Sequence, residues 1–212
     1  MTLNFGTIEC YPDCFCEPHA GAGILFWSSG AYFLSASLLY FRTPRKTLEF
    51  EFWVFCNITL AISSFLFHAT QTRTTLALDY ASIVMTLIFF PLWTQMGKLS
   101  RRKKETIFYI VYISSWILFL QLGQVMRIGF SIVVFIISLI AVRQEAVRFR
   151  SHGYLQAAVV LSVLSFFLFL LEETRWACDK ASFFQAHALW HMGSATALYL
   201  YGRWRFSHHS LR

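Results

Sequence analysis

The chain has 212 residues, of which 57% are hydrophobic and 14% are charged, and its 18 Lys and Arg residues against 11 Asp and Glu residues give a formal charge of +7. This composition excludes an ordinary soluble domain, because a single core cannot bury so much apolar surface. It does not indicate nucleic-acid binding either. The densest basic run, at 98–104, lies in a short segment between two apolar blocks, where membrane topology accounts for it.

The apolar residues occur in blocks whose lengths suit membrane-spanning helices. We predict one all-α membrane domain over 1–212, a seven-transmembrane helix bundle with an extramembrane N-terminal segment at 1–21 and a tail at 204–212. The fourth and fifth spans are short, and fusing them would give six spans. We separate them because the segment 121–124 is expected to turn the chain. The predicted spans are 22–41, 50–69, 76–97, 106–120, 127–142, 155–171 and 183–203.

The basic residues predict the orientation of this bundle. Fourteen of the 18 fall in alternate loops and the tail, on one side of the seven spans. Lys and Arg in short loops stay cytoplasmic, which predicts an outside or lumenal N-terminus and a cytoplasmic C-terminus. No Lys or Arg precedes Arg42, so we expect the first span to remain in the mature protein rather than act as a cleaved signal peptide. The membrane would be endoplasmic reticulum or Golgi in a eukaryote and inner membrane in a bacterium.

Polar residues inside the spans are the functional candidates, because lipid makes them costly to bury. Ser64 and His68 lie four residues apart on the second span, His187 and His191 lie four apart on the seventh, and Asp79 lies near the start of the third. Residues four apart share a helix face. The alternating direction of the spans puts all five near the outer face. Four terminal or loop histidines are assigned no role: His19, His152, His208 and His209.

Three histidines with one open position form the ligand set of a catalytic zinc, and an i, i+4 pair on one helix can chelate a single ion. Taken singly, each histidine is more often a hydrogen-bonded bundle residue or an interfacial side chain. The convergence of three at one depth, beside Asp79 and Ser64, favours a metal site. The sequence therefore predicts a zinc site made by His68, His187 and His191.

These motifs resemble those of the alkaline ceramidases, and more broadly the superfamily of seven-helix hydrolases that includes the progestin and adipoQ receptors. The run Ser-Phe-Leu-Phe-His at 64–68 is similar to the family's Ser-x3-His, Asp79 follows after ten intervening residues, and His-Ala-Leu-Trp-His at 187–191 is similar to its His-x3-His. The resemblance implies a zinc-dependent amide hydrolase that cleaves ceramide, a membrane lipid, into a fatty acid and a sphingoid base. It implies no obligate protein partner.

The resemblance also implies roles for two residues beside the zinc ligands. Asp79 would be the general base for the catalytic water, and Ser64 would stabilise the oxyanion. Asp79 could instead be a helix N-cap or a partner that orients a zinc-bound histidine, and Ser64 could be a helix-packing hydroxyl. The rival functions are hydrolysis of a different lipid amide and signalling of the adipoQ type. A transporter fits less well, because its polar residues would spread through the membrane.

The N-terminal segment and the loop before the last span carry four cysteines on the predicted outer side, where disulfides are permitted. The spacing of Cys10, Cys14 and Cys16 matches no standard zinc pattern. We prefer a bridge between this segment and the loop, from Cys16 to Cys178, and that pair is also similar to the family's disulfide.

Phe-Cys-Glu at 15–17 resembles the family's calcium-binding entry segment, but the match then degrades. Cys14, His19 and Ser28 replace the family's Asp, Asn and later Glu. Asp13 and Glu17 alone offer too few oxygen ligands for calcium. We therefore expect weak or absent calcium binding.

Overall fold

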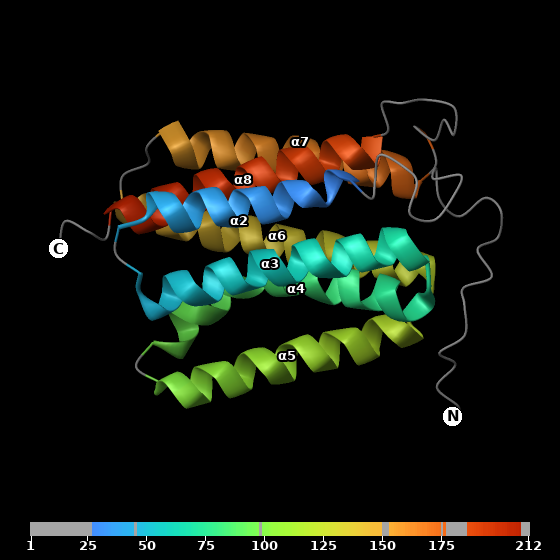
Figure 1. Ribbon diagram of the computed structural model, residues 1–212, viewed down its shortest axis with the longest axis horizontal. Coiled ribbons are helices and arrows are strands. Elements are labelled where there is room, and N and C mark those ends of the chain that lie inside the picture. The colour runs from blue at the N-terminus through green and yellow to red at the C-terminus, as the bar shows by residue number, and fades with distance from the viewer. Residues whose placement is uncertain are drawn as a thin grey trace.

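The computed structural model describes residues 27–44, 46–97, 99–149, 153–174, 176 and 186–208. Over these residues the chain forms seven helices and no strand. The helices lie lengthwise beside one another (Figure 1). They are α2 Gly30–Arg42, α3 Leu48–Thr70, α4 Arg73–Met96, α5 Arg101–Gln121, α6 Gln124–Phe149, α7 Gly153–Glu173 and α8 Ala186–His208. The predicted all-α fold with seven helices is confirmed for the described residues.

Six of these helices form a ring, and α5 lies outside it against α4 (Figure 1). Around the ring α7 packs on α8, α8 on α2, α2 on α3, α3 on α4 and α4 on α6, whereas α6 and α7 touch only slightly. Large aromatic side chains fill the interior, among them the fully buried Trp53, Phe89 and Trp204. Such rings bring large apolar areas and close packing to helix contacts. The ring is therefore well packed except at the boundary between α6 and α7.

A short turn joins α3 to α4 and fixes the position of two candidate site residues. Gln71 adopts a left-handed conformation at φ 47°, and the Thr72 hydroxyl caps α4 by accepting a hydrogen bond from the Thr75 N–H at 3.2 Å. The cap satisfies a backbone donor that would otherwise lack a helical partner. With only these two residues between the helices, the end of α3 that carries His68 must lie beside the start of α4 that carries Asp79.

The predicted turn at 121–124 is also confirmed, since α5 ends at Gln121 and α6 begins at Gln124. The helix ends differ from the predicted spans. Helix α5 begins at Arg101 rather than 106, α6 continues to Phe149 rather than 142, and α8 extends to His208, inside the predicted tail. A helix can continue past the hydrocarbon region because long basic side chains reach the polar interface while the backbone stays hydrogen-bonded.

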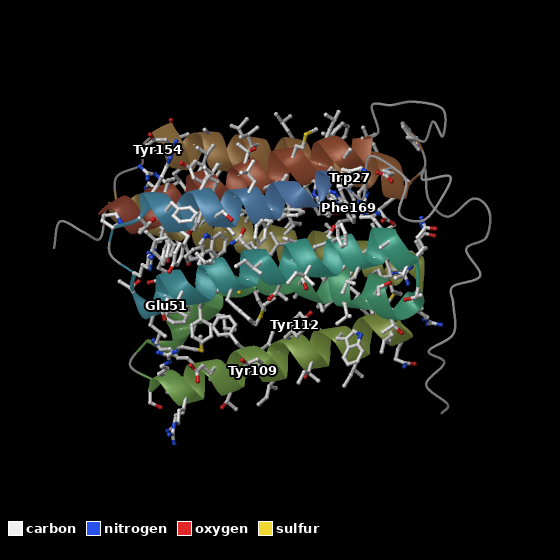
Figure 2. All side chains as sticks on the ribbon, in the orientation of Figure 1. Trp27, Glu51, Tyr109, Tyr112, Tyr154 and Phe169 are labelled. Atoms are coloured by element: carbon white, nitrogen blue, oxygen red, sulfur yellow. The ribbon has the colours of Figure 1, made fainter. Side chains whose placement is uncertain are left out.

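Four of the described helices are long and apolar enough to cross a membrane: α3, α4, α6 over Gln124–Val147, and α7. The described part of α2 has only 13 residues, and α5 opens with four basic residues. Large apolar side chains are also exposed, including Ile110 on α5 and Phe167 on α7, at 58% and 57%. Figure 2 shows side chains that point away from the bundle along α5 and α7. Outward apolar faces on continuous helices suit lipid contact. The count of seven spans and their orientation stay predictions.

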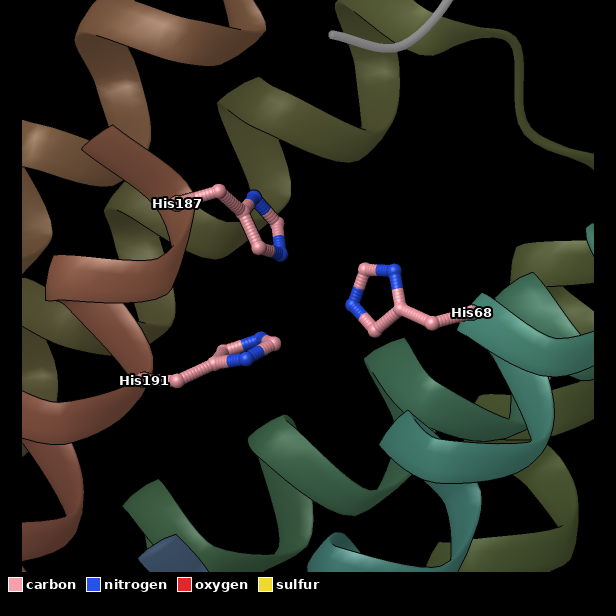
Figure 3. Close-up of side chains that lie close together, drawn as sticks. All are labelled: His68, His187 and His191. Carbon is pink, nitrogen blue, oxygen red and sulfur yellow. The ribbon is translucent and has the colours of Figure 1, made fainter. Parts of the chain in front are cut away.

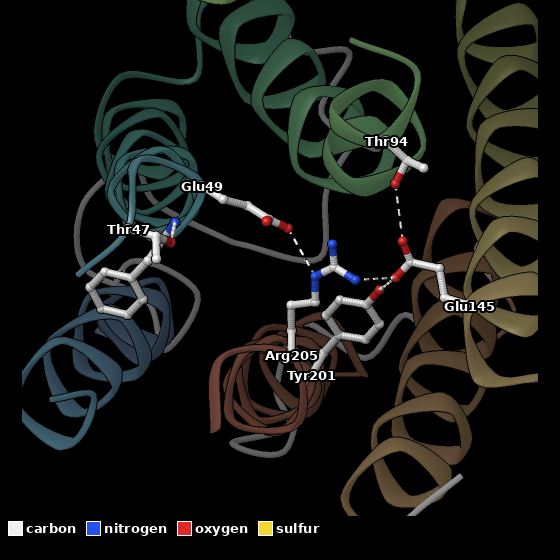
Figure 4. Close-up of polar contacts among 7 residues, drawn as sticks. Thr47, Glu49, Thr94, Glu145, Tyr201 and Arg205 are labelled. Carbon is white, nitrogen blue, oxygen red and sulfur yellow. Dashed lines mark hydrogen bonds and ion pairs between the residues drawn. The ribbon is translucent and has the colours of Figure 1, made fainter. Parts of the chain in front are cut away.

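At the end of the ring opposite the histidines, a buried polar cluster connects four helices (Figure 4). Arg205 of α8 donates to Glu49 Oε1 of α3 at 2.9 Å and to Glu145 Oε2 of α6 at 3.3 Å. The two oxygens of Glu145 also accept hydrogen bonds from Thr94 of α4 at 3.0 Å and from Tyr201 of α8 at 3.1 Å. The cluster therefore joins α6 to α8 across the ring, where α6 has little contact with α7.

We expect Arg205→Met to lower the free energy of unfolding by about 3–5 kcal/mol, because it leaves two largely buried carboxylates without their cation. The side chains of Arg205 and Glu145 are only 11% and 10% exposed. Thermal unfolding in detergent, followed by tryptophan fluorescence, measures the change. The control is Glu105→Gln, which removes the surface Arg101–Glu105 pair and should leave the melting temperature close to that of the parent. Equal melting temperatures for the two variants would contradict a stabilising role for the cluster.

Candidate metal centre

Three buried imidazoles face one another at one end of the ring (Figure 3). His68 lies in the last turn of α3, and His187 and His191 lie in the first turns of α8. One ring nitrogen from each histidine lies within 4.8 Å of the other two. His68, His187 and His191 are 2%, 5% and 0% exposed. The predicted convergence of the three histidines is confirmed, and the group could hold a metal ion.

The geometry and chemistry of these donors fit a small divalent cation. The ring centroids are 5.2 Å apart for His68 and His187, 5.1 Å for His68 and His191, and 4.6 Å for His187 and His191. Two nitrogens on one tetrahedral ion lie about 3.4 Å apart, so small ring rotations would complete the set. Among the described residues, the buried His187 Nε2 has no hydrogen-bond partner. A buried polar atom of this kind is costly unless something binds it.

The local sequence of α8 holds its two histidines in place. Because they are four residues apart, both project from one face of the helix. Trp190 lies between them in sequence, and its ring centroid is 4.8 Å from that of His187 and 5.0 Å from that of Phe169 on α7. The tryptophan therefore packs this turn of α8 against α7 and restricts the His187 ring.

The Nδ1 atom of each α8 histidine lies beside a polar side chain that the sequence did not single out as a site residue. His187 Nδ1 lies 2.9 Å from Glu172 Oε2 at the end of α7, and His191 Nδ1 lies 2.8 Å from Ser28 Oγ. Glu172 follows directly after the predicted span 155–171 and so was not counted among its polar residues. Its position directly after the apolar stretch of α7 is the available signal. Ser28 had been noted only as a departure from the family's calcium segment.

Ser64 lies beside the histidine cluster, as the sequence predicts. Its Oγ is 3.4 Å from His191 Nε2 and 3.0 Å from Ser29 Oγ, which precedes α2. The hydroxyl therefore contacts both the histidine cluster and a neighbouring segment. The site role and the helix-packing role that the sequence left open are compatible in this geometry.

Asp79 lies in the second turn of α4 and is 4% exposed. Its Oδ1 is at hydrogen-bonding distance, 3.5 Å, from the hydroxyl of Ser63, the neighbour of Ser64 in the chain. The N-cap of α4 is Thr72. The alternative that Asp79 caps this helix is therefore wrong. Its buried carboxyl contacts Ser63 of α3 instead.

The remaining predicted site residues lie outside the described residues: Asp13, Glu17, Cys16 and Cys178. The calcium and disulfide predictions made for them stay predictions. Within the described part of the chain, Cys56 is a free, buried thiol.

Comparisons of the chain with protein-family models, with curated proteins and with solved structures found no match.

We expect the purified protein to bind about one divalent ion per chain, and His68→Ala and His187→Ala to lose stoichiometric binding, because each removes one of three ligands. Metal analysis by mass spectrometry after removal of free ions measures the ratio. The control is His152→Ala, which removes a histidine that the sequence places in a loop. Folded parent protein that retains no ion after incubation with zinc would contradict a metal centre.

Proposed function

We propose that this chain is a zinc-dependent amide hydrolase of membrane lipids, with ceramide as the first candidate substrate. The observation that supports it most strongly is the buried cluster of His68, His187 and His191, whose nitrogens lie within 4.8 Å of one another. Imidazole ligands also suit copper, iron and nickel. Zinc is favoured because three histidines with an open position match catalytic zinc sites and the ceramidase-like motifs.

When bound, zinc would act as a Lewis acid on an amide carbonyl and make water more acidic. Asp79 would take a proton from the attacking water and pass it to the leaving amine. The Ser64 hydroxyl would donate a hydrogen bond to the oxyanion that develops on the carbonyl oxygen. Water adds its hydroxyl to the acyl carbon, the C–N bond breaks, and the products are a fatty acid and an amine. From ceramide this amine would be a sphingoid base.

Narrow apolar cavities next to the centre support a substrate with a long chain. A cavity of about 70 Å³ is lined in part by Tyr32 and Trp190, whose rings lie against those of His191 and His187, and a second of about 70 Å³ continues toward Tyr201. The Tyr32 and His191 ring centroids are 5.6 Å apart. Both cavities are lined by Thr86, Leu87, Phe135, Ser162 and Leu198. An acyl chain would lie along these residues.

The slight contact between α6 and α7 suggests where such a chain enters. The rings of Phe135 on α6 and Phe166 on α7 stack there with centroids 4.1 Å apart. Movement of these two rings would open the cavities toward surrounding lipid. A molecule already in the bilayer would reach the site more readily than one in water.

The positions of the described basic residues support an outside or lumenal site. Arg42, Arg203 and Arg205 lie at the ends of α2 and α8 away from the histidines, and Arg101–Lys104 begin α5 at that same end. Under the positive-inside rule that end faces the cytoplasm. The histidines would then lie near the opposite face of the membrane.

We expect Asp79→Asn to lower the rate of fatty-acid release about 10²- to 10⁴-fold, and Ser64→Ala about 10²- to 10³-fold, with zinc content unchanged in both. Chromatography of products from ceramide and a panel of other lipid amides measures the rates, with Glu105→Gln as a surface control. Activity on another lipid amide alone would replace ceramide as substrate. Zinc-loaded parent protein inactive on the whole panel would contradict the hydrolase proposal and favour the signalling alternative.

We also expect Ser162→Phe to lower kcat/KM for a long-chain amide by about tenfold or more and to affect a short-chain amide less, because the ring would fill both cavities. The control is Leu164→Phe, at an outward position of α7 that is 55% exposed. Kinetics on substrates that differ only in acyl length make the comparison. Equal losses for both chain lengths would argue against an acyl site in these cavities.

A further inference from the structure

A buried carboxylate from a separate helix contacts the metal centre. Glu172, in the last turn of α7, places its Oε2 2.9 Å from His187 Nδ1. The two side chains are 6% and 7% exposed. A carboxylate is costly to bury without a partner, and His187 Nδ1 lies within ion-pair distance of this oxygen, although the two atoms are not aligned as a hydrogen bond. Removing either side chain would therefore leave the other one buried without its partner.

This contact decides which nitrogen of His187 is available to an ion. A negative carboxylate 2.9 Å from Nδ1 favours the tautomer that carries its proton on Nδ1 and its lone pair on Nε2. His187 Nε2 is buried and has no hydrogen-bond partner among the described residues. The open nitrogen is thus the one on the side of the ring away from Glu172.

Close packing of α7 against α8 sets the register of this pair. At Gly193 of α8 a β-carbon would collide with the Ser165 hydroxyl of α7, so the two backbones approach closely there. Glu172 lies seven residues after Ser165, two turns along the same face, and His187 lies six residues before Gly193. Because the helices run in opposite directions, the close approach at Gly193 places Glu172 and His187 at a similar level along the two helix axes.

The adjacent carboxylate has different partners. Glu173 Oε1 accepts a hydrogen bond from the Tyr80 hydroxyl at 3.1 Å, and its backbone carbonyl accepts one from Gln124 at 3.2 Å. Glu172 and Glu173 are therefore neighbouring buried carboxylates with different contacts. Glu172 contacts a candidate metal ligand, whereas Glu173 contacts α4 and the start of α6, so Glu173 can serve as the control.

We infer that Glu172 is a positioning residue for the metal centre, which restricts the His187 ring and strengthens its Nε2 as a ligand through the negative charge that it places beside Nδ1. Carboxylates in this position increase the basicity of a metal-bound histidine. The inference rests on the metal-binding part of the proposed function and not on hydrolysis. It also makes the α7–α8 contact part of the site.

Zinc affinity, measured by competition with a chromophoric chelator, tests the inference without any substrate. We expect Glu172→Ala to weaken zinc binding about 10- to 100-fold, and the nearly isosteric Glu172→Gln to weaken it less, because an amide oxygen keeps a dipole beside Nδ1 but carries no charge. Glu173→Gln should stay within about twofold of the parent. If Glu172→Ala does not fold, the test rests on Glu172→Gln alone. A zinc affinity of Glu172→Gln equal to that of Glu173→Gln would overturn the inference.

The visible spectrum of the cobalt-substituted protein gives a second readout that a merely structural role would not change. We expect the d–d bands to shift in Glu172→Gln and to stay unchanged in Glu173→Gln, because only the first removes the charge beside a ligand's Nδ1. Unshifted bands together with unchanged zinc affinity would overturn the inference. A parent that binds no metal would overturn it together with the metal centre. A parent that binds zinc but hydrolyses no lipid amide would refute the hydrolase proposal alone, and the affinity series would still decide on Glu172.

Discussion

The cost of burying polar atoms among apolar helices is the constraint on which this structure depends. The described interior holds polar side chains among a larger number of apolar ones, and several of them lie within hydrogen-bonding distance of a partner, as Ser63 does of Asp79 and Glu172 does of His187. In an apolar medium each such partner stabilises the helix pairing that supplies it. The polar contacts therefore select the arrangement of helices, while the aromatic core fills the space between them.

Connectivity then decides where those polar atoms meet. The two-residue turn between α3 and α4 keeps His68 and Asp79 at one end of the ring, and the close approach of α7 and α8 at Gly193 brings Glu172 to that same end. The candidate centre thus draws residues from four helices and from the segment before α2. Its geometry depends on local features, a capped turn and a glycine contact, more than on the length of any helix.

The sequence was sufficient to predict the part of the site that follows helical periodicity. Spacing of four placed His187 beside His191, and the depth of each span brought His68 to them, as the structure bears out. Partners that come from tertiary register were not predictable in this way. Glu172 follows the last apolar residue of its span, so no periodic pattern connects it to a histidine on the next helix. The capping residue also depends on local chemistry: the Thr72 hydroxyl, and not Asp79, caps the first turn of α4.

The two polar ends of the ring differ in a way that bears on function. At one end, both oxygens of Glu145 accept hydrogen bonds, from Thr94, Tyr201 and Arg205, so the carboxylate is satisfied by the protein itself. At the other end, His187 has Glu172 at one nitrogen and no hydrogen-bond partner among the described residues at the other, although the ring is buried. A satisfied cluster needs nothing further and stabilises the fold. An imidazole that is oriented on one side and open on the other, facing two more imidazoles, is arranged for a ligand that the chain does not supply.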